Sequence, residues 1–180
     1  MPKNLMFDCQ MTTYDMAALE ELVETIKPVH SLEVGSWKGQ STSIIARHSS
    51  AVYCVDTWRG APDEREMVKE AQEQSIFDIF WQNMSILRLT DKVKPLIMTS
   101  DQARVIIIDD FIDFIYIDGD HTYDAVKWDL DWFGKLKKGG YMAGHDYDDA
   151  HGGVRRALDE RFEGQFKVLN KSSIWVIQKA

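Results

Sequence analysis

The stretch from Phe114 to Tyr123, FIYIDGDHTY, constrains the fold more than any other part of this sequence. Its first four residues are apolar and are interpreted as a buried strand. The Asp-Gly-Asp-His that follows cannot lie inside such a strand, so these polar residues must sit where the strand ends. Open α/β sheets bind their ligands at the carboxyl ends of their strands. The sequence therefore predicts an enzyme or a ligand-binding domain rather than a structural protein.

Strands and helices alternate along the rest of the chain. We expect strands at residues 31–34, 51–55, 93–98, 113–117 and 141–143, and helices at 12–27, 41–48, most of 63–88, 122–137 and 152–162. Residues 103–110 are interpreted as a short helix leading into a turn, although 105–108 could equally be a strand. A closing antiparallel hairpin is expected at 166–169 and 173–179. This order is typical of a parallel sheet with helices on both faces, whose right-handed connections bring the strand exits to one edge.

Two helices carry finer expectations. Asp15 is expected to lie off the apolar face of the first helix, which is formed by Met16, Leu19, Val23 and Ile26. The helix at 122–137 is expected to end at Lys138-Gly139-Gly140, because basic residues followed by glycine are typical of a helix C-terminus.

Length and composition narrow the classes of protein. A chain of 180 residues fits one domain, taken as 1–180 with an irregular lead-in at 1–11. The net charge of −8 argues against a nucleic-acid partner, because phosphate binding needs a basic surface. Cys9 and Cys54 have neither metal nor disulfide spacing, so we expect Cys54 to be a core thiol and the protein to be cytoplasmic. The sequence shows no signal peptide and no apolar run near the roughly 18 residues of a membrane helix, so no membrane partner is expected, and a homo-oligomer is left open.

The first predicted strand exit carries glycines. Gly35 and Gly39, on either side of Ser36-Trp37-Lys38, would let the backbone approach a ligand closely. The dinucleotide fingerprint needs a third glycine where this chain has Thr42, and the Gly-Lys-Ser/Thr of a phosphate loop is missing. A structural turn is therefore as plausible here as a binding loop.

The second and third exits offer groups that suit a nucleoside. Asp56 follows Gly35 by about 20 residues, the offset at which nucleotide-binding α/β domains place a carboxylate for the ribose. The alternative is a solvated acid in a loop, and Trp58 could cover the site or pack in the core. Ser100 and Asp101 could hydrogen-bond an adenine edge, cap the next helix, or do both.

The fourth and fifth exits carry acids and histidines. Adjacent parallel strands would bring Asp118 and His121 together with His145 and Asp146. Carboxylates with imidazole suit a divalent ion, Mg²⁺ or Mn²⁺. His121 is the natural general base, with a pKa expected near neutrality. The alternative is that Asp118 binds backbone and His121 caps the following helix.

Taken together, these motifs resemble the class I S-adenosylmethionine-dependent methyltransferases. More narrowly, the chain is similar to the small metal-dependent O-methyltransferases that include the macrolide-sugar (macrocin-type) and catechol enzymes. The resemblance covers roughly residues 12–180. It is carried by LEVGSWKGQST at 32–42, VDTW at 55–58 and IDGDHTY at 117–123, with KGG at 138–140 and HDY at 145–147.

The resemblance implies a Rossmann-like, doubly wound α/β fold with a mostly parallel seven-stranded sheet and an antiparallel closing strand. It implies methyl transfer to a hydroxyl of a small-molecule acceptor, with Asp118 and His121 as the catalytic residues and His121 as the base. A divalent ion, Mg²⁺ or Mn²⁺, would be held by Asp118, His145 and Asp146. The cofactor, S-adenosylmethionine, would be bound by Glu33, Gly35, Ser36, Gly39, Asp56, Thr57, Trp58, Ser100, Asp101 and Asp118.

His145 departs from the pattern of this family. Metal-dependent relatives place two acids or Asp-Asn where this chain has His145-Asp146, so His145 is either a nitrogen ligand or no ligand. A metal-independent methyltransferase and a cofactor-binding domain without activity therefore stay open as alternatives. Residues 59–84 are interpreted as a mobile lid, although the second half of this stretch could equally be a sheet-covering helix.

Overall fold

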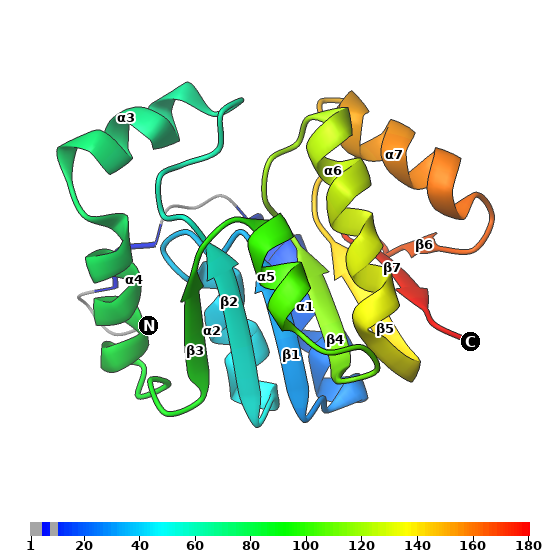
Figure 1. Cartoon of the computed structure of the whole chain (residues 1–180), viewed down its shortest axis with the longest axis horizontal. Helices are drawn as coiled ribbons and strands as arrows, with labels where there is room; N and C mark the ends of the chain where they lie inside the picture. Colours follow the sequence, from blue (N-terminus) through cyan, green and yellow to red (C-terminus); the bar gives the residue numbers. More distant parts are fainter. Residues whose placement is uncertain (1–4, 8–10) are drawn as a thin grey trace.

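A sheet of seven strands lies at the centre of the molecule, in the order β3-β2-β1-β4-β5-β7-β6 (Figure 1). The computed structural model describes residues 5–7 and 11–180, so Cys9 and most of the lead-in predicted at 1–11 lie outside the described residues. The strands are β1 (His30–Val34), β2 (Ala51–Asp56), β3 (Val93–Ile97), β4 (Ile112–Ile117), β5 (Leu136–Gly144), β6 (Lys167–Val168) and β7 (Trp175–Gln178).

The topology places a binding crevice in the middle of this sheet. Strands β1 to β5 are parallel, whereas β7 is antiparallel to both β5 and β6, which confirms the predicted mostly parallel sheet with an antiparallel closing strand. The chain builds outward from β1 through β2 to β3 and then returns to the other side of β1 at β4. The exits of β1 and β4 therefore form the switch point at which such sheets bind ligands.

Helices cover both faces of the sheet (Figure 1). One layer holds α1, α2 and α4, and the other holds α5, α6 and α7. Alternate residues of a strand face opposite layers, so Cys54 packs with the first layer and Val55 with the second. Cys54 is fully buried, as predicted. The helices are α1 (Thr13–Ile26), α2 (Gln40–His48), α3 (Arg65–Glu73), α4 (Ile76–Ile86), α5 (Ser100–Ile106), α6 (Tyr123–Asp129), the 3₁₀-helix η1 (Leu130–Lys135) and α7 (Gly152–Phe162).

Helix α1 begins in a capping box and buries an acid. The Thr12 hydroxyl accepts from the Asp15 backbone N–H, and the Asp15 carboxylate accepts from the Thr12 backbone N–H in return. The prediction that Asp15 lies off the buried face is wrong, because its side chain is only 3% exposed. Asp15 also accepts from the backbone N–H of Ser173, which ties α1 to the turn before β7.

The predicted helix at 122–137 is too long. Helix α6 ends at Asp129, the 3₁₀-helix follows, and β5 begins at Leu136, so the Lys138-Gly139-Gly140 run lies inside a strand. The pairing of β4 with β5 shifts between Ile112 and Phe114, and Gly139 adopts a φ of +78° at this irregularity. Glycine serves a strand irregularity as well as a helix end, and the sequence pattern alone does not distinguish the two.

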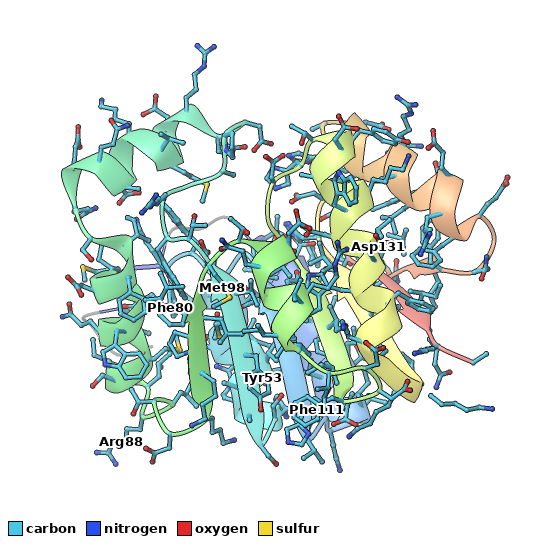
Figure 2. The ribbon with its side chains drawn as sticks, viewed as in Figure 1. Tyr53, Phe80, Arg88, Met98, Phe111 and Asp131 are labelled. Carbon is cyan, nitrogen blue, oxygen red and sulfur yellow. The ribbon has the colours of Figure 1, made fainter. Side chains whose placement is uncertain are left out.

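The stretch at 63–88 is divided into two helices of different character. Helix α3 buries none of its residues, whereas α4 buries Ile76, Phe80 and Met84 among others. Phe80 lies between α4 and the sheet (Figure 2). In the part of the chain that the structure describes, no helix is long and apolar enough to cross a membrane.

Candidate active site

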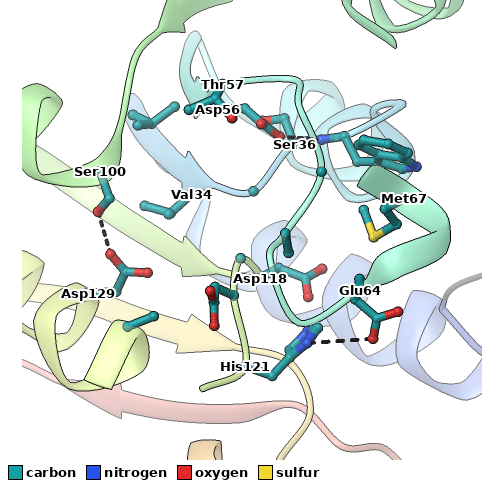
Figure 3. A pocket seen from close by; sticks show the side chains of 18 of the residues that line it. Val34, Ser36, Asp56, Thr57, Glu64, Met67, Ser100, Asp118, His121 and Asp129 are labelled. Carbon is teal, nitrogen blue, oxygen red and sulfur yellow. Dashed lines mark hydrogen bonds and ion pairs between the residues drawn. The ribbon is translucent and has the colours of Figure 1, made fainter. Parts of the chain in front are cut away.

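A cavity of about 640 Å³ opens at the edge where the parallel strands end (Figure 3). This size suits a cofactor and a small ligand. Its lining comes from the exits of β1 to β5 and from residues 60–67, and it includes most of the residues that the sequence predicts for the site. These are Gly35, Ser36, Asp56, Thr57, Ser100, Asp101, Asp118, His121, His145 and Asp146.

The exits of β1 and β4 touch each other through their backbones at Gly35. Gly35 has a φ of +84°, and a Cβ atom built on it would lie 2.0 Å from the carbonyl oxygen of Asp118. Only glycine fits this position. Next to it, the Asp56 carboxylate accepts from the backbone N–H groups of Trp37 at 2.8 Å and Trp58 at 2.6 Å. Burial raises the pKa of Asp56, although these backbone donors counteract part of the shift.

Glu33 lies beneath the cavity rather than in its lining. Its side chain is fully buried, and one oxygen accepts from Ser36 and Thr42 while the other, Oε1, has no hydrogen-bond partner among the residues that the structure describes. Burial raises the pKa of Glu33 to about 7, even though the hydroxyl donors lower it. Glu33 is therefore placed to orient the β1 exit from below.

Trp58 and Gly39 also lie behind the lining. The Trp58 ring is 5% exposed, packs against Phe77 and Phe80, and donates from Nε1 to the Trp37 carbonyl at 2.8 Å. The packing alternative for Trp58 is therefore the one observed, and its ring does not reach the cavity. Gly39 begins α2 with a φ of +88°, packed so closely that a Cβ would lie 2.6 Å from Met84.

At the β3 exit, the residue that caps α5 is not one of those predicted, and an acid that was not predicted lines the cavity. Thr99, rather than Ser100 or Asp101, is the N-cap of α5. The Asp101 carboxylate is exposed and pairs with Arg104 at 3.1 Å. The Ser100 hydroxyl donates to Asp129, a buried acid from the end of α6 that lines the cavity and that the sequence analysis did not select. Burial raises the pKa of Asp129 to about 6.

The β4 and β5 exits bring their four predicted residues together. His145 Nδ1 lies 2.9 Å from Asp146 Oδ1 and 3.7 Å from Asp118 Oδ1. His121 Nε2 lies 3.0 Å from Asp146 Oδ2. The predicted grouping of Asp118, His121, His145 and Asp146 is confirmed.

Two further acids extend this group at either end. Asp15 Oδ2 lies 3.4 Å from His145 Nε2, and Asp63 Oδ2 lies 3.0 Å from His121 Nδ1. The result is a row in which acids and imidazoles alternate from α1 to the loop before α3. The capping-box spacing of Thr12 and Asp15 hides this second role of Asp15, and no pattern around Asp63 marks it as a partner of His121.

Mutual contacts set the charges in this row. Burial lowers the pKa of His121, but its hydrogen bond to Asp146 and the nearby carboxylates outweigh burial and raise the pKa to about 9. In the same way the pKa of His145 rises to about 10. The hydrogen bonds from both imidazoles hold the pKa of Asp146 well below its usual range despite burial, whereas burial raises that of Asp118 to about 6.

The expectation of a pKa near neutrality for His121 is therefore wrong for this arrangement. Both ring nitrogens face carboxylates, which favour the protonated imidazole, so His121 would have to release a proton from Nε2 before it can act as a base.

The donor set at the β4 and β5 exits fits a divalent ion. Asp118, His145 and Asp146 each offer one ligand atom, and these atoms lie within 4.8 Å of one another. Two carboxylates with one imidazole suit Mg²⁺ or Mn²⁺. His145 Nδ1 faces both carboxylates. The histidine that stands where the family pattern has an acid therefore still offers a ligand atom to this group.

The loop and helix after β2 border the cavity from above. Gly60, Pro62, Glu64 and Met67 line it, and α3 lies beyond the ends of the strands (Figure 1). Glu64 Oε1 and His121 Nδ1 lie 4.0 Å apart. Figure 3 marks this ion pair with a dashed line. The first half of the 59–84 stretch thus lies where a lid would, and the second half is a sheet-covering helix. That the first half moves stays a prediction.

Comparison with known proteins gives a family for this fold. Residues 32–147, more than half of the chain, match the model of a family described as a methyltransferase domain. The matched region contains every residue predicted for the site. A search of curated proteins found no match.

Solved structures of similar fold are distant in sequence. An O-methyltransferase from Bacillus cereus in complex with SAH is 20% identical, with a TM-score of 0.62 over 94% of this chain and 83% of that chain. The O-methyltransferase TomG from Streptomyces achromogenes in complex with SAM is 15% identical, with a TM-score of 0.66 over 96% and 83%. The O-methyltransferase NovP is 19% identical, with a TM-score of 0.66 over 92% and 79%. At these identities the likeness concerns the fold.

Proposed function

Because the chain belongs to the methyltransferase-domain family, we propose that it is an S-adenosylmethionine-dependent O-methyltransferase that acts on a hydroxyl of a small molecule with the help of a divalent ion. One observation carries the proposal: a single cavity is lined on one side by Gly35 and Asp56, which suit a nucleoside, and on the other by the acids and imidazoles of Asp118 and His121. Neighbours of the same fold with bound SAM or SAH support the choice of cofactor.

The β1 and β2 exits would hold the cofactor. Gly35 leaves room for the methionine part beside the Asp118 backbone, and Asp56 offers its remaining lone pairs to the ribose hydroxyls. When bound, S-adenosylmethionine supplies a methyl group on a sulfonium sulfur. The residues of this chain then contribute mainly by positioning the acceptor oxygen in line with that methyl group.

The β4 and β5 exits would handle the proton of the acceptor. Asp118, His145 and Asp146 would hold the divalent ion, which when bound lowers the pKa of a coordinated hydroxyl. Asp63 accepts from Nδ1 of His121 and so fixes the tautomer that leaves Nε2 for the acceptor. His121 would first release its Nε2 proton, which faces Asp146, to solvent, and the neutral imidazole would then take the acceptor's proton at Nε2.

Calorimetry tests the proposal. S-adenosylmethionine and S-adenosylhomocysteine are titrated into the purified protein with Mg²⁺ and then with EDTA. Turnover is then followed on catechols and sugars with a radiolabelled methyl group. Micromolar binding with Mg²⁺-dependent turnover is expected, and absence of binding under both conditions would contradict the cofactor assignment.

The alternatives differ in what the same assay returns. A metal-independent methyltransferase would turn over equally in EDTA, and a non-catalytic domain would bind the cofactor but transfer the methyl group to no acceptor. A cytoplasmic location, a homo-oligomer and the absence of nucleic-acid and membrane partners stay predictions.

A further inference from the structure

The adenine end of the proposed cofactor site contains an acid that the sequence motifs do not mark. If the methionine part lies near Gly35 and the ribose at Asp56, the base must extend toward the β3 exit and α6, where Ser100, Ala125 and Asp129 line the cavity. Three carboxylates line the cavity near this end, those of Asp101, Asp120 and Asp129, and Asp120 accepts from the Thr122 backbone N–H. They differ in burial and in partners.

The Asp129 side chain is buried, and one of its two carboxylate oxygens accepts a hydrogen bond. Its side chain is 6% exposed, and Oδ1 accepts from the Ser100 hydroxyl, whose oxygen in turn accepts from Trp132 Nε1 at 2.8 Å. Figure 3 shows Ser100 and Asp129 facing each other at the cavity wall. The second oxygen, Oδ2, lies beside Gly119, where a Cβ would approach it to 3.8 Å, and makes no hydrogen bond to a described residue.

Asp101 lacks these properties. Its side chain is 68% exposed and its carboxylate is engaged by Arg104, one turn further along α5. An exposed acid paired with arginine discriminates weakly between ligands, because water can replace either partner.

We infer that Asp129 determines the specificity for the adenine base of the cofactor; this inference rests on the proposed function. Asp129 would accept a hydrogen bond from the exocyclic 6-amino group of adenine through Oδ2. A carbonyl oxygen at the 6-position would face this buried carboxylate as a second acceptor. The site would therefore reject a hypoxanthine base, because a buried acceptor without a donor is costly.

Binding of paired ligands tests this role. S-adenosylhomocysteine and S-inosylhomocysteine, which differ at the 6-position of the base, are titrated by calorimetry into wild type, Asp129→Asn and the matched control Asp124→Asn, an exposed acid of the same helix that does not line the cavity. Wild type and Asp124→Asn are expected to prefer the adenine ligand at least tenfold. Asp129→Asn keeps the acceptor for Ser100 but can also donate, so its preference is expected to fall to about twofold or less.

The outcomes separate this inference from the proposed function. Tight binding of S-adenosylhomocysteine to wild type together with an unchanged preference in Asp129→Asn would overturn the role of Asp129 and leave the proposed function intact. No binding to wild type would overturn both. If Asp129→Asn does not fold, equal affinity of wild type for the two ligands would still overturn the inference.

Discussion

At the scale of single residues, His121 is the side chain whose removal should separate chemistry from binding. It lies on the acid–imidazole side of the cavity and makes its contacts with Asp63 and Asp146. His121→Ala is expected to keep S-adenosylhomocysteine affinity within about threefold and to reduce turnover by about 10² or more, the usual contribution of a general base. Calorimetry and initial rates measure the two effects. Turnover near the wild-type rate would remove His121 as the base.

A change at Asp56 should impair cofactor binding, in contrast to a change at His121, which should impair turnover. Asp56→Ala is expected to weaken S-adenosylhomocysteine about tenfold or more, because the ribose hydroxyls and the N–H groups of Trp37 and Trp58 lose their acceptor. Asp56→Asn retains one carbonyl oxygen and should fall between wild type and Asp56→Ala in a calorimetric titration. Equal affinity in all three proteins would take Asp56 out of the site.

Sequence patterns identified the residues that follow directly on strands, such as Asp118 and His145, because a strand exit fixes both the edge and the neighbour. They did not identify Asp129 or Asp63. Asp129 sits among charged residues near the end of a helix, and only the packing of α6 against the β4 exit shows that its side chain is buried. Asp63 reaches His121 across a loop, and loop paths do not follow from periodicity.

At the scale of elements, the helix α3 and the loop before it meet the site through Asp63 and Glu64. Asp63 accepts from both the backbone N–H and Nδ1 of His121, so this loop and the proposed base are held together. Helix α3 has no buried residue of its own. Its position over the cavity therefore depends on polar contacts and on the partly buried Met67 and Ala71, which pack against the core, rather than on a fully buried apolar face.

Asp63→Asn is expected to lower kcat about tenfold while S-adenosylhomocysteine affinity stays unchanged, because an amide holds the His121 tautomer less strongly than a carboxylate does. Glu66→Gln, an exposed change in the first turn of α3, serves as the control and should match wild type. Initial rates over a range of acceptor concentrations measure kcat and KM separately. A loss confined to KM would instead assign Asp63 to acceptor binding.

Element types were predicted well where periodicity was long and poorly where one composition fits two structures. The alternation of strands and helices predicted the topology. The short helix expected at 103–110 is met by α5, which begins earlier, at Ser100, and ends at Ile106, so the strand alternative for 105–108 is wrong. The run Lys138-Gly139-Gly140 was misassigned because its irregularity comes from pairing with β4, a contact that is distant in sequence.

At the scale of the whole molecule, the fold gathers acids at the switch point of the sheet. Burial raises the pKa of Glu33 to about 7 and those of Asp118 and Asp129 to about 6. Each of these pKa values lies above the value of roughly 4 expected for the same side chain in an unfolded chain. At a pH between the unfolded and the folded pKa, the folded protein therefore binds more protons than the unfolded one. The free energy of unfolding therefore falls as pH rises through this window.

Glu33→Gln tests this linkage without a change in size. For Glu33 the window runs from about pH 4 to 7, and each pH unit with one extra proton on the folded state changes the free energy of unfolding by about 1.4 kcal/mol. In urea titrations at pH 5, 6 and 7 without cofactor, the variant is expected to lose stability less steeply than wild type. Asp113→Asn is the control: burial raises the Asp113 pKa, but Lys137 and the His30 backbone N–H outweigh it and lower the value, so its effect lies below about pH 4 and the wild-type slope should persist. A Glu33→Gln slope equal to that of wild type would mean that Glu33 is ionised in the folded protein throughout this range.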